Sequence, residues 1–395
     1  MNRMDSSQLM SFDELKQFES LAEGFAQKDV QSMFEGEHPD GDLERLPEIL
    51  NISFEIGLAV SPDPHMDGAE YGIWGRGIDS FGLLSSISLL SIIAEKCGGV
   101  AMLLNAQGVA SNILLHTGKN IPGNPTRVAL CLQESNMPPY FETVINPNTE
   151  EPAPVETVAS KTDDTYVLNG EKHYSYSMPD TDSYVVMAKI QDKWGCFVVP
   201  SKIDGLTVTD AGRRTGLRAC NLNHISFNNV RIPKETRIDS GDAIKLVIRA
   251  LSLNWIGMSA IAAGIAKAAV DAAKQYVSER YQGGKLIQEH AAVKSLIAGA
   301  EANARNAMNS VRSLLDVELN SIETLKESAM EKHSGIILSA QAVTDSLQSF
   351  GGYGYMEDFG MEKKLRDVTV LKSASGSPYF LKQFIYDVEL KGDRI

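Results

Sequence analysis

The sequence has few cysteines. Only four occur in 395 residues, and none stands in a Cys-x-x-Cys spacing. So sparse a set excludes a disulfide-rich secreted scaffold and a cysteine-based zinc site. It is typical of a reducing compartment, where thiols serve as small core residues. We therefore expect buried thiols in a cytoplasmic protein, at Cys97, Cys131, Cys196 and Cys220.

Long apolar runs and an excess of positive charge are also missing. The opening stretch, MNRMDSSQLMSFDELK, lacks the apolar core of a signal peptide. The most apolar run, FGLLSSISLLSII at 81–93, is too short and too rich in serine to cross a membrane. The formal net charge is −14, whereas a nucleic-acid partner needs a basic face. We therefore expect a cytoplasmic protein with neither a membrane nor a nucleic acid as partner.

Several common catalytic signatures are absent as well. The chain has no G-x-S-x-G elbow and no G-x-x-x-x-G-K-[ST] phosphate loop. No group of His, Cys and Asp residues has the spacing of metal ligands, so the sequence predicts no metal site.

What the sequence does contain is an order of helices, then strands, then helices. Nearly continuous apolar content over 79–95 and 98–117 predicts two buried helices in an N-terminal helical domain, residues 1–125. Short β-branched and aromatic segments separated by turns predict a small barrel or sandwich over 126–236. Helical periodicity returns over 237–395, and its Ala- and Gly-rich stretch 251–281 predicts an inner helix of a bundle. The fold class is therefore α+β multidomain.

Four segments occur in an order and spacing that resemble the acyl-CoA dehydrogenase superfamily. They are YVLNGEKHYSY at 166–176, GLRACNLNHISFNNVRIPKE at 216–235, YVSERYQGGKLIQEH at 276–290 and LQSFGGYGYMEDFGMEKKLRD at 347–367. The resemblance covers roughly residues 80 to 385. It implies an N-terminal helical domain, a middle β-barrel and a C-terminal four-helix bundle.

The resemblance also implies a cofactor, a reaction and partners. FAD would lie between barrel and bundle, completed by a neighbouring subunit of a homodimer or homotetramer. The implied reaction is the α,β-dehydrogenation of an acyl-CoA thioester in fatty acid metabolism. The flavin accepts hydride, while a carboxylate removes the α-proton. The resemblance leaves electron-transfer flavoprotein open as a partner, and the sequence does not identify the electron acceptor.

Residues for FAD are carried over position by position. Arg280 matches the family arginine that reaches the FAD phosphate. Gln348, Gly351 and Gly352 match a glycine turn at the diphosphate, since backbone without a Cβ can approach phosphate closely. A plain helix-ending turn and a solvated arginine are the simpler interpretations of the same residues.

The flavin-facing positions depart more from the family. Gln133, Tyr174, Tyr176 and Ser377 take cofactor-binding positions, although barrel core explains the tyrosines equally well. A two-residue period places Tyr174 and Tyr176 on one face of the strand and His173, Ser175 and Ser177 on the other. A Met-Pro-Pro-Tyr stretch at 137–140 replaces a Gly/Ser loop, and proline has no amide hydrogen to donate to a phosphate.

The base is the sharpest departure. Counted from Arg366-Asp367, the family glutamate falls on Ser375, and a serine hydroxyl needs a partner before it can act as a base. The alternative base position, on the long inner helix, is Asn254. Both usual positions therefore lack a carboxylate.

Other groups near the expected site are weaker candidates for the base. An imidazole changes charge near neutral pH, but His173 is expected on the barrel surface. Glu134 matches a position that is structural in the family. Glu357, Asp358 and Glu362 are expected to face solvent or cap helices.

Three hypotheses about function stay open. The chain is an acyl-CoA dehydrogenase-like flavoenzyme with an atypical base or substrate. Alternatively, it is a non-catalytic subunit of a hetero-oligomer with an active paralogue. The third hypothesis is a flavin-dependent monooxygenase on the same fold, whose chemistry needs no α-proton base.

Overall fold

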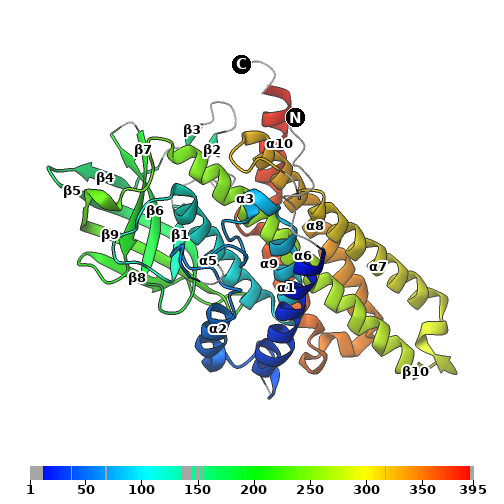
Figure 1. The fold of residues 1–395 in the computed structure, drawn as a ribbon. Helices are drawn as coiled ribbons and strands as arrows, with labels where there is room; N and C mark the ends of the chain where they lie inside the picture. The colour runs from blue at the N-terminus through cyan, green and yellow to red at the C-terminus, as the bar shows by residue number, and fades with distance from the viewer. Residues whose placement is uncertain are drawn as a thin grey trace.

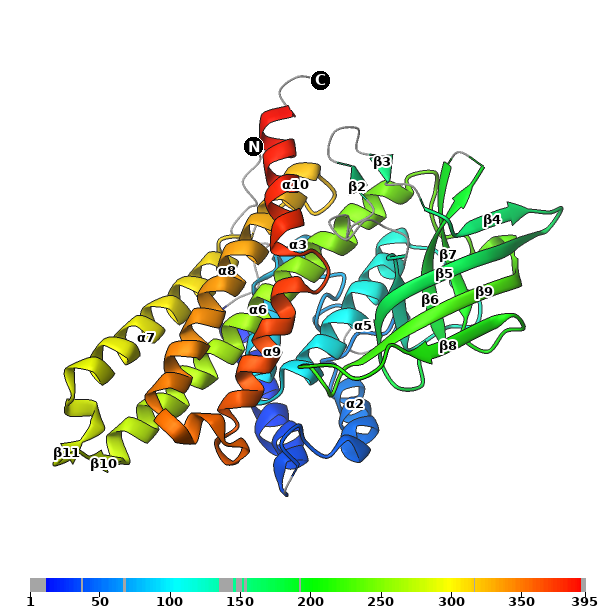
Figure 2. The same ribbon diagram turned by 180° about the vertical axis from the view of Figure 1, so that it is seen from behind.

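The computed structural model describes residues 12–36, 38–66, 69–134, 145–146, 151–152, 155–191, 193–315 and 317–391. Helices and strands follow the predicted order, with helices on both sides of a strand-rich middle in sequence (Figures 1 and 2). The fold class is confirmed. All four cysteines are buried and free, as expected.

The N-terminal part is helical and packs against the bundle. It contains α1 (Phe12–Phe25), η1 (Ala26–Val30), η2 (Gln31–Phe34), η3 (Leu43–Arg45), α2 (Leu46–Glu55), α3 (Ile78–Phe81), α4 (Leu84–Lys96) and α5 (Gly98–Thr117). The helix expected over 79–95 is interrupted, so that prediction is wrong in detail. Gly82, with φ +78°, ends α3, and the Leu83 amide donates to the Leu315 carbonyl at 3.2 Å before α4 begins.

The middle part is one seven-stranded, mostly antiparallel sheet. Its strands are β1 (Val128–Cys131), β4 (Val158–Lys161), β5 (Thr165–Ser177), β6 (Ser183–Ile190), β7 (Lys193–Pro200), β8 (Leu206–Asp210) and β9 (Asn221–Pro233). The order is β1-β6-β4-β5-β9-β8, with β7 paired to the other strands through β6. A separate pair, β2 (Ile145–Asn146) and β3 (Glu151–Pro152), lies above the sheet in Figure 1.

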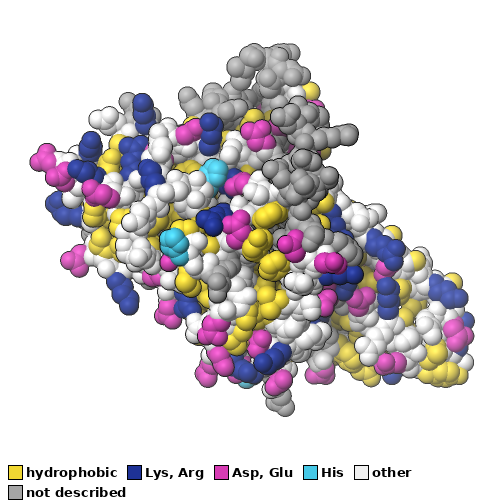
Figure 3. Space-filling view, viewed as in Figure 1, with side chains coloured by type: hydrophobic (Ala, Val, Ile, Leu, Met, Phe, Trp, Pro, Cys, Tyr) yellow, Lys and Arg dark blue, Asp and Glu magenta, His cyan; other side chains and the backbone are white. Residues whose placement is uncertain are grey.

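The C-terminal part is a bundle around one long helix, α6 (Ala243–Glu279), which begins after η4 (Lys234–Thr236). A small hairpin of β10 (Tyr281–Gln282) and β11 (Lys285–Leu286), followed by η5 (Ile287–Glu289), connects α6 to the next helix. The remaining elements are α7 (Ala291–Arg312), α8 (Ile322–Ser349), η6 (Gly351–Tyr355), η7 (Glu357–Phe359), α9 (Met361–Ser373) and α10 (Pro378–Lys391). Figure 3 shows hydrophobic side chains gathered at the free end of the bundle, near β10.

Two described helices, α5 and α6, are long and apolar enough to span a membrane by length and composition. Their most apolar windows are 89% and 94% buried inside the protein. Both are core helices: α5 lies between the sheet and the bundle, where it contacts β1, β5 and α6 (Figure 2). The position of α5 between the sheet and the bundle defines the candidate site, because the sheet, α5 and α6 together line a cavity.

Candidate functional site

A cavity of about 520 Å³ lies where the sheet meets the helices. Its walls come from α5, the end of β1, residues 173–176 of β5, the first half of α6 and the end of α9. Most of the lining surface is apolar, and none of the lining residues that the structure describes is an aspartate or a glutamate. The cavity is suited to an acyl chain or a flat ring and has no carboxylate for proton removal among those residues.

Both expected base positions face this cavity and bind each other. Asn254 Nδ2 donates to Ser375 Oγ at 3.0 Å. Behind them, Asn105 Nδ2 donates to Asn254 Oδ1 at 2.9 Å, and Trp74 Nε1 donates to Asn105 Oδ1 at 2.7 Å. A neutral series of hydrogen bonds therefore occupies the two positions where the family carries a carboxylate, and both positions lack one here, as the sequence predicted.

The turn that carries Ser375 is held in an uncommon conformation. Ser375 has φ +51° and Gly376 has φ +122°. Lys332 Nζ donates to the Gly376 carbonyl at 2.6 Å, and the Trp255 indole donates to the Ser375 carbonyl. A left-handed serine costs about 1–2 kcal/mol, so these two buried donors are what keep the turn in place.

Strand β5 departs from the expected alternation at the cavity mouth. Lys172 pairs with Ile225 but Ser175 pairs with Asn223, so one extra residue is inserted between the paired positions. Such a bulge resets which residues share a face. Tyr174 has φ +56° and is half exposed. It was expected on the face opposite His173.

That expectation for His173 is wrong. The imidazole rings of His173 and His224 lie 4.4 Å apart, and the Tyr174 ring lies 5.1 Å from His224, so all three gather on one side of the strand. Ser175 and Ser177 keep the opposite, buried face. His173 is thus at the cavity, with Nε2 3.2 Å from Glu171 Oε2.

Two further expected cofactor residues line the cavity, Gln133 and Tyr176. Burial raises the pKa of Tyr176, so its phenol stays neutral at physiological pH. Ser377 is not among the lining residues. Its Oγ accepts from the Phe380 amide at 3.3 Å and caps the start of α10 instead. The Met-Pro-Pro-Tyr stretch lies outside the described residues.

Glu134 has a structural role. Its Oε1 accepts from Lys172 Nζ at 2.8 Å and from the Thr157 amide at 3.0 Å. Burial alone would raise the pKa of Glu134, but the Lys172 charge and the donated hydrogen bonds outweigh it and lower that pKa. This buried, paired carboxylate ties β5 to the segment just before β4, and it is not free to take a proton.

The other four expected FAD residues lie at the far end of the bundle. Arg280 follows the last turn of α6, and its guanidinium stacks over the Tyr353 ring at 5.3 Å. Its Nε is buried without a hydrogen-bond partner among the described residues. Gln348 is exposed, and no atom of another segment that the structure describes lies within 4 Å of where a Cβ would stand on Gly351 or Gly352. A guanidinium close to a glycine turn with open space above its backbone fits a phosphate site.

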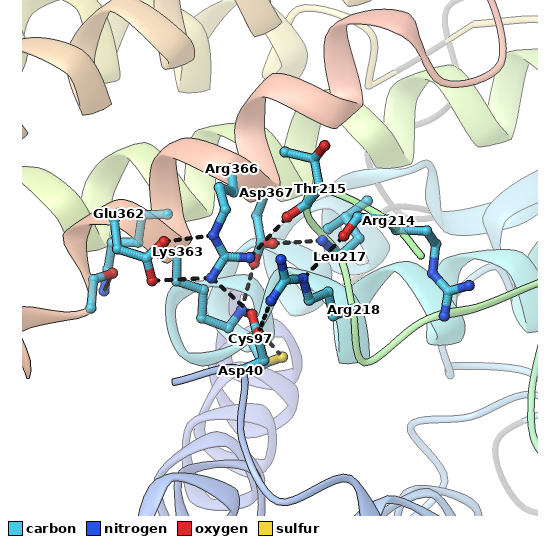
Figure 4. A network of polar contacts seen from close by, with 12 residues as sticks. Asp40, Cys97, Arg214, Thr215, Leu217, Arg218, Glu362, Lys363, Arg366 and Asp367 are labelled. Atoms are coloured by element: carbon cyan, nitrogen blue, oxygen red, sulfur yellow. Dashed lines mark hydrogen bonds and ion pairs between the residues drawn. The ribbon is translucent and has the colours of Figure 1, made fainter. Parts of the chain in front are cut away.

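Arg366 and Asp367 join three parts of the fold (Figure 4). Arg366 Nη2 lies 2.9 Å from Asp40 Oδ1, and Nη1 donates to the Thr215 carbonyl at 2.9 Å. Asp367 accepts from the Leu217 amide at 2.6 Å. These contacts tie the N-terminal segment and the loop before β9 to α9, which leads to Ser375. The pair therefore positions the loop and lies outside the cavity lining.

Sequence reasoning missed Asn105 and Trp74. Both are fully buried. The available signal was the run of polar side chains, Asn105, Gln107, Ser111 and Asn112, on the otherwise apolar helix α5. A buried amide needs a partner, and that partner was not visible along the chain.

Comparisons with known proteins agree with this geometry. The family model "acyl-CoA dehydrogenase, C-terminal domain" matches residues 241–387, and "acyl-CoA dehydrogenase, middle domain" matches 149–230. An acyl-CoA dehydrogenase of Bacillus subtilis (strain 168) is 29% identical over 56% of this chain and 60% of its own length. The caffeyl-CoA reductase-Etf complex subunit CarC of Acetobacterium woodii is 27% identical over 60% and 64%. The chain thus spans less than two thirds of these relatives.

A solved structure shows the same fold over the whole chain. The acyl-CoA dehydrogenase complexed with FAD from Bacillus anthracis superposes with a TM-score of 0.76 at 18% identity. The match covers 100% of this chain and 70% of that one.

Proposed function

Because this chain belongs to the acyl-CoA dehydrogenase family, we propose that it is a flavin-dependent oxidoreductase that binds an acyl-CoA thioester in the cavity of about 520 Å³. The observation that carries the proposal is this cavity. It lies between the sheet and the bundle, and both expected base positions face it. Its apolar walls suit an acyl chain, and no described side chain fills it.

The residues present fit FAD in two separate places. Gln133 and Tyr176 line the cavity, and Tyr174 stands at its mouth with a ring free to stack. Arg280 and the open glycine turn lie at the free end of the bundle (Figure 1). One chain does not bring the two sets together, so the proposal includes a second subunit that supplies the phosphate-binding end. The Bacillus anthracis neighbour is complexed with FAD, which supports FAD as the cofactor.

When bound, FAD supplies the hydride acceptor; this chain must still take a proton from the substrate. Among the described residues that line the cavity, His173 carries the only imidazole. Its Nε2 pairs with Glu171 at 3.2 Å, which orients the ring and leaves Nδ1 to accept a proton. We therefore assign proton transfer to His173 Nδ1, with Glu171 as its positioning residue.

A second candidate is favoured by the neutral Asn254–Ser375 pair. If the chain is a non-catalytic subunit, its partner supplies the base, and the cavity here stays unproductive.

Electron-transfer flavoprotein is the proposed electron acceptor of the active form, since one relative is a subunit of an Etf complex.

The visible spectrum of the purified protein tests these alternatives. The flavoenzyme is expected to be yellow or to take up added FAD, and to bleach anaerobically with a suitable acyl-CoA. His173→Gln is expected to lower the bleaching rate by about 100-fold, the low end for a lost proton-transfer group, without weakening acyl-CoA binding. A colourless protein that takes up no FAD contradicts the proposal and supports the non-catalytic subunit. A yellow protein that no acyl-CoA bleaches, but that consumes oxygen once reduced with substrate present, supports a monooxygenase.

A further inference from the structure

The chain of hydrogen bonds behind Ser375 has a fixed direction. An indole N–H can only donate, so Trp74 Nε1 requires the Asn105 oxygen as its acceptor. The Asn105 amide nitrogen then donates to Asn254 Oδ1. The Asn254 amide nitrogen in turn donates to Ser375 Oγ. Each amide orientation follows from the one before it.

The packing around these hydrogen-bonded side chains is close. A Cβ on Gly257 would lie 2.0 Å from Asn105 Oδ1, and a Cβ on Gly108 would lie 2.3 Å from the Ile73 carbonyl beside Trp74. Trp74 itself has φ +61° and is held there by its amide, which donates to Ser86 Oγ at 3.0 Å. A strained tryptophan and two glycines at close contacts indicate a site built to hold these amides in place.

The last group in this series of hydrogen bonds is the Ser375 hydroxyl, and its hydrogen is still available to donate. Its oxygen already accepts from Asn254, and no hydrogen bond among the described residues uses its hydrogen. We propose that Ser375 donates a hydrogen bond to the ligand. The position then acts as a donor, where a carboxylate base would act as an acceptor. A carboxylate accepts hydrogen bonds or takes a proton; this hydroxyl gives a hydrogen bond.

A hydrogen-bond donor at position 375 favours a different ligand from the one that a carboxylate base would favour. This inference rests on the proposed function, in which the position faces the α-carbon of an acyl thioester. A donor in a mostly apolar cavity loses free energy unless the ligand brings an acceptor. The ligand that fits is an acyl thioester with an oxygen on its α- or β-carbon, as in a hydroxyacyl or oxoacyl group. A plain saturated acyl chain would leave the Ser375 hydroxyl unpaired.

Isothermal titration calorimetry of the FAD-loaded protein tests this, with butyryl-CoA, 2-hydroxybutyryl-CoA and 3-hydroxybutyryl-CoA as probes. We expect at least one hydroxyacyl thioester to bind about fivefold to tenfold more tightly than butyryl-CoA, the gain from one added hydrogen bond. Ser375→Ala should remove this preference, so that butyryl-CoA and the two hydroxyacyl thioesters bind the variant with equal affinity. Trp74→Phe keeps an aromatic side chain but removes the indole N–H that orients the Asn105 amide, and should reduce the preference partly.

The outcomes separate this inference from the proposed function. Equal affinities for all three thioesters in the native chain overturn the inference alone. A preference for hydroxyacyl thioesters that persists in Ser375→Ala also overturns the inference, because another group must then bind the hydroxyl oxygen of the acyl chain. Absence of binding by all three thioesters contradicts the proposed function and this inference with it.

Discussion

Asn254 and Ser375 are 121 residues apart in sequence, yet Asn254 Nδ2 donates to Ser375 Oγ at 3.0 Å. Each occupies a position where the family resemblance implies a carboxylate. Two neutral groups that satisfy each other avoid the cost of burying a charge. The substitutions are therefore matched: with an amide at 254, a hydroxyl at 375 completes the chain from Trp74.

Ser375→Glu places a carboxylate back at the loop position. We expect butyryl-CoA to bleach the FAD-loaded variant at least about 100-fold faster than the native chain, the gain usual for a positioned base. Anaerobic stopped-flow absorbance measures the rate. Ser375→Gln is the matched control, because it has the same size without a base. Equal rates for the Glu and Gln variants would show that position 375 does not reach the α-proton.

Gly257→Ala is expected to destabilise the fold by about 2 kcal/mol, within the usual range for overpacking a core. The added Cβ would meet Asn105 Oδ1 at 2.0 Å and force apart α5 and α6. Urea unfolding measures the change. Gly299→Ala on α7 is the control: its nearest atom is Asp345 Oδ2 at 3.8 Å, so helix propensity should stabilise it by about 0.5–1 kcal/mol. Equal effects of the two changes would contradict the close packing at Gly257.

Asp367→Asn removes the charge that faces Lys363 Nζ at 2.5 Å in the buried network of Figure 4. An unpaired buried ammonium is costly, so the free energy of unfolding should fall by about 3 kcal/mol. Glu362→Gln is the control, since Arg366 keeps its contact with Asp40 and the loss should stay below about 1 kcal/mol. Comparable losses in both variants would mean that Asp367 is not the anchor of α9.

The raised pKa of the buried Glu331 carboxyl predicts that the stability of the fold depends on pH. Burial raises the pKa of Glu331 from its ordinary value of 4.5 to about 7, and Ser310 Oγ donates to one of its oxygens. Between these pH values the folded chain keeps a proton that the unfolded chain has released, so stability falls as pH rises. At about 1.4 kcal/mol per pKa unit, the loss between pH 4.5 and pH 7 is at most about 3.5 kcal/mol.

Urea unfolding at pH 5 and pH 8 checks this prediction. Glu331→Gln should flatten the difference between the two pH values, whereas Glu327→Gln, at a half-buried position of the same helix, should not. A native-like pH difference in Glu331→Gln would assign the effect to another group.

Much of the fold was predictable from local pattern. Apolar content predicted α5 within a residue at each end, and small residues predicted α6 as the inner helix. The interruption at Gly82 was missed, because a glycine within an apolar run shows its positive φ only once α3 meets the Leu315 carbonyl. The bulge at Tyr174 was missed because a two-residue period assumes an unbroken pairing with β9.

The sequence by itself determined the order of helices and strands, and the absence of a carboxylate at residues 375 and 254. Both follow from residue type and spacing along the chain. Only the tertiary structure decided that Asn254 and Ser375 meet, that Trp74 and Asn105 orient them, and that His173 lies at the cavity. Hydrogen bonds between distant segments depend on how helices and sheet pack, and one-dimensional periodicity carries no record of that packing.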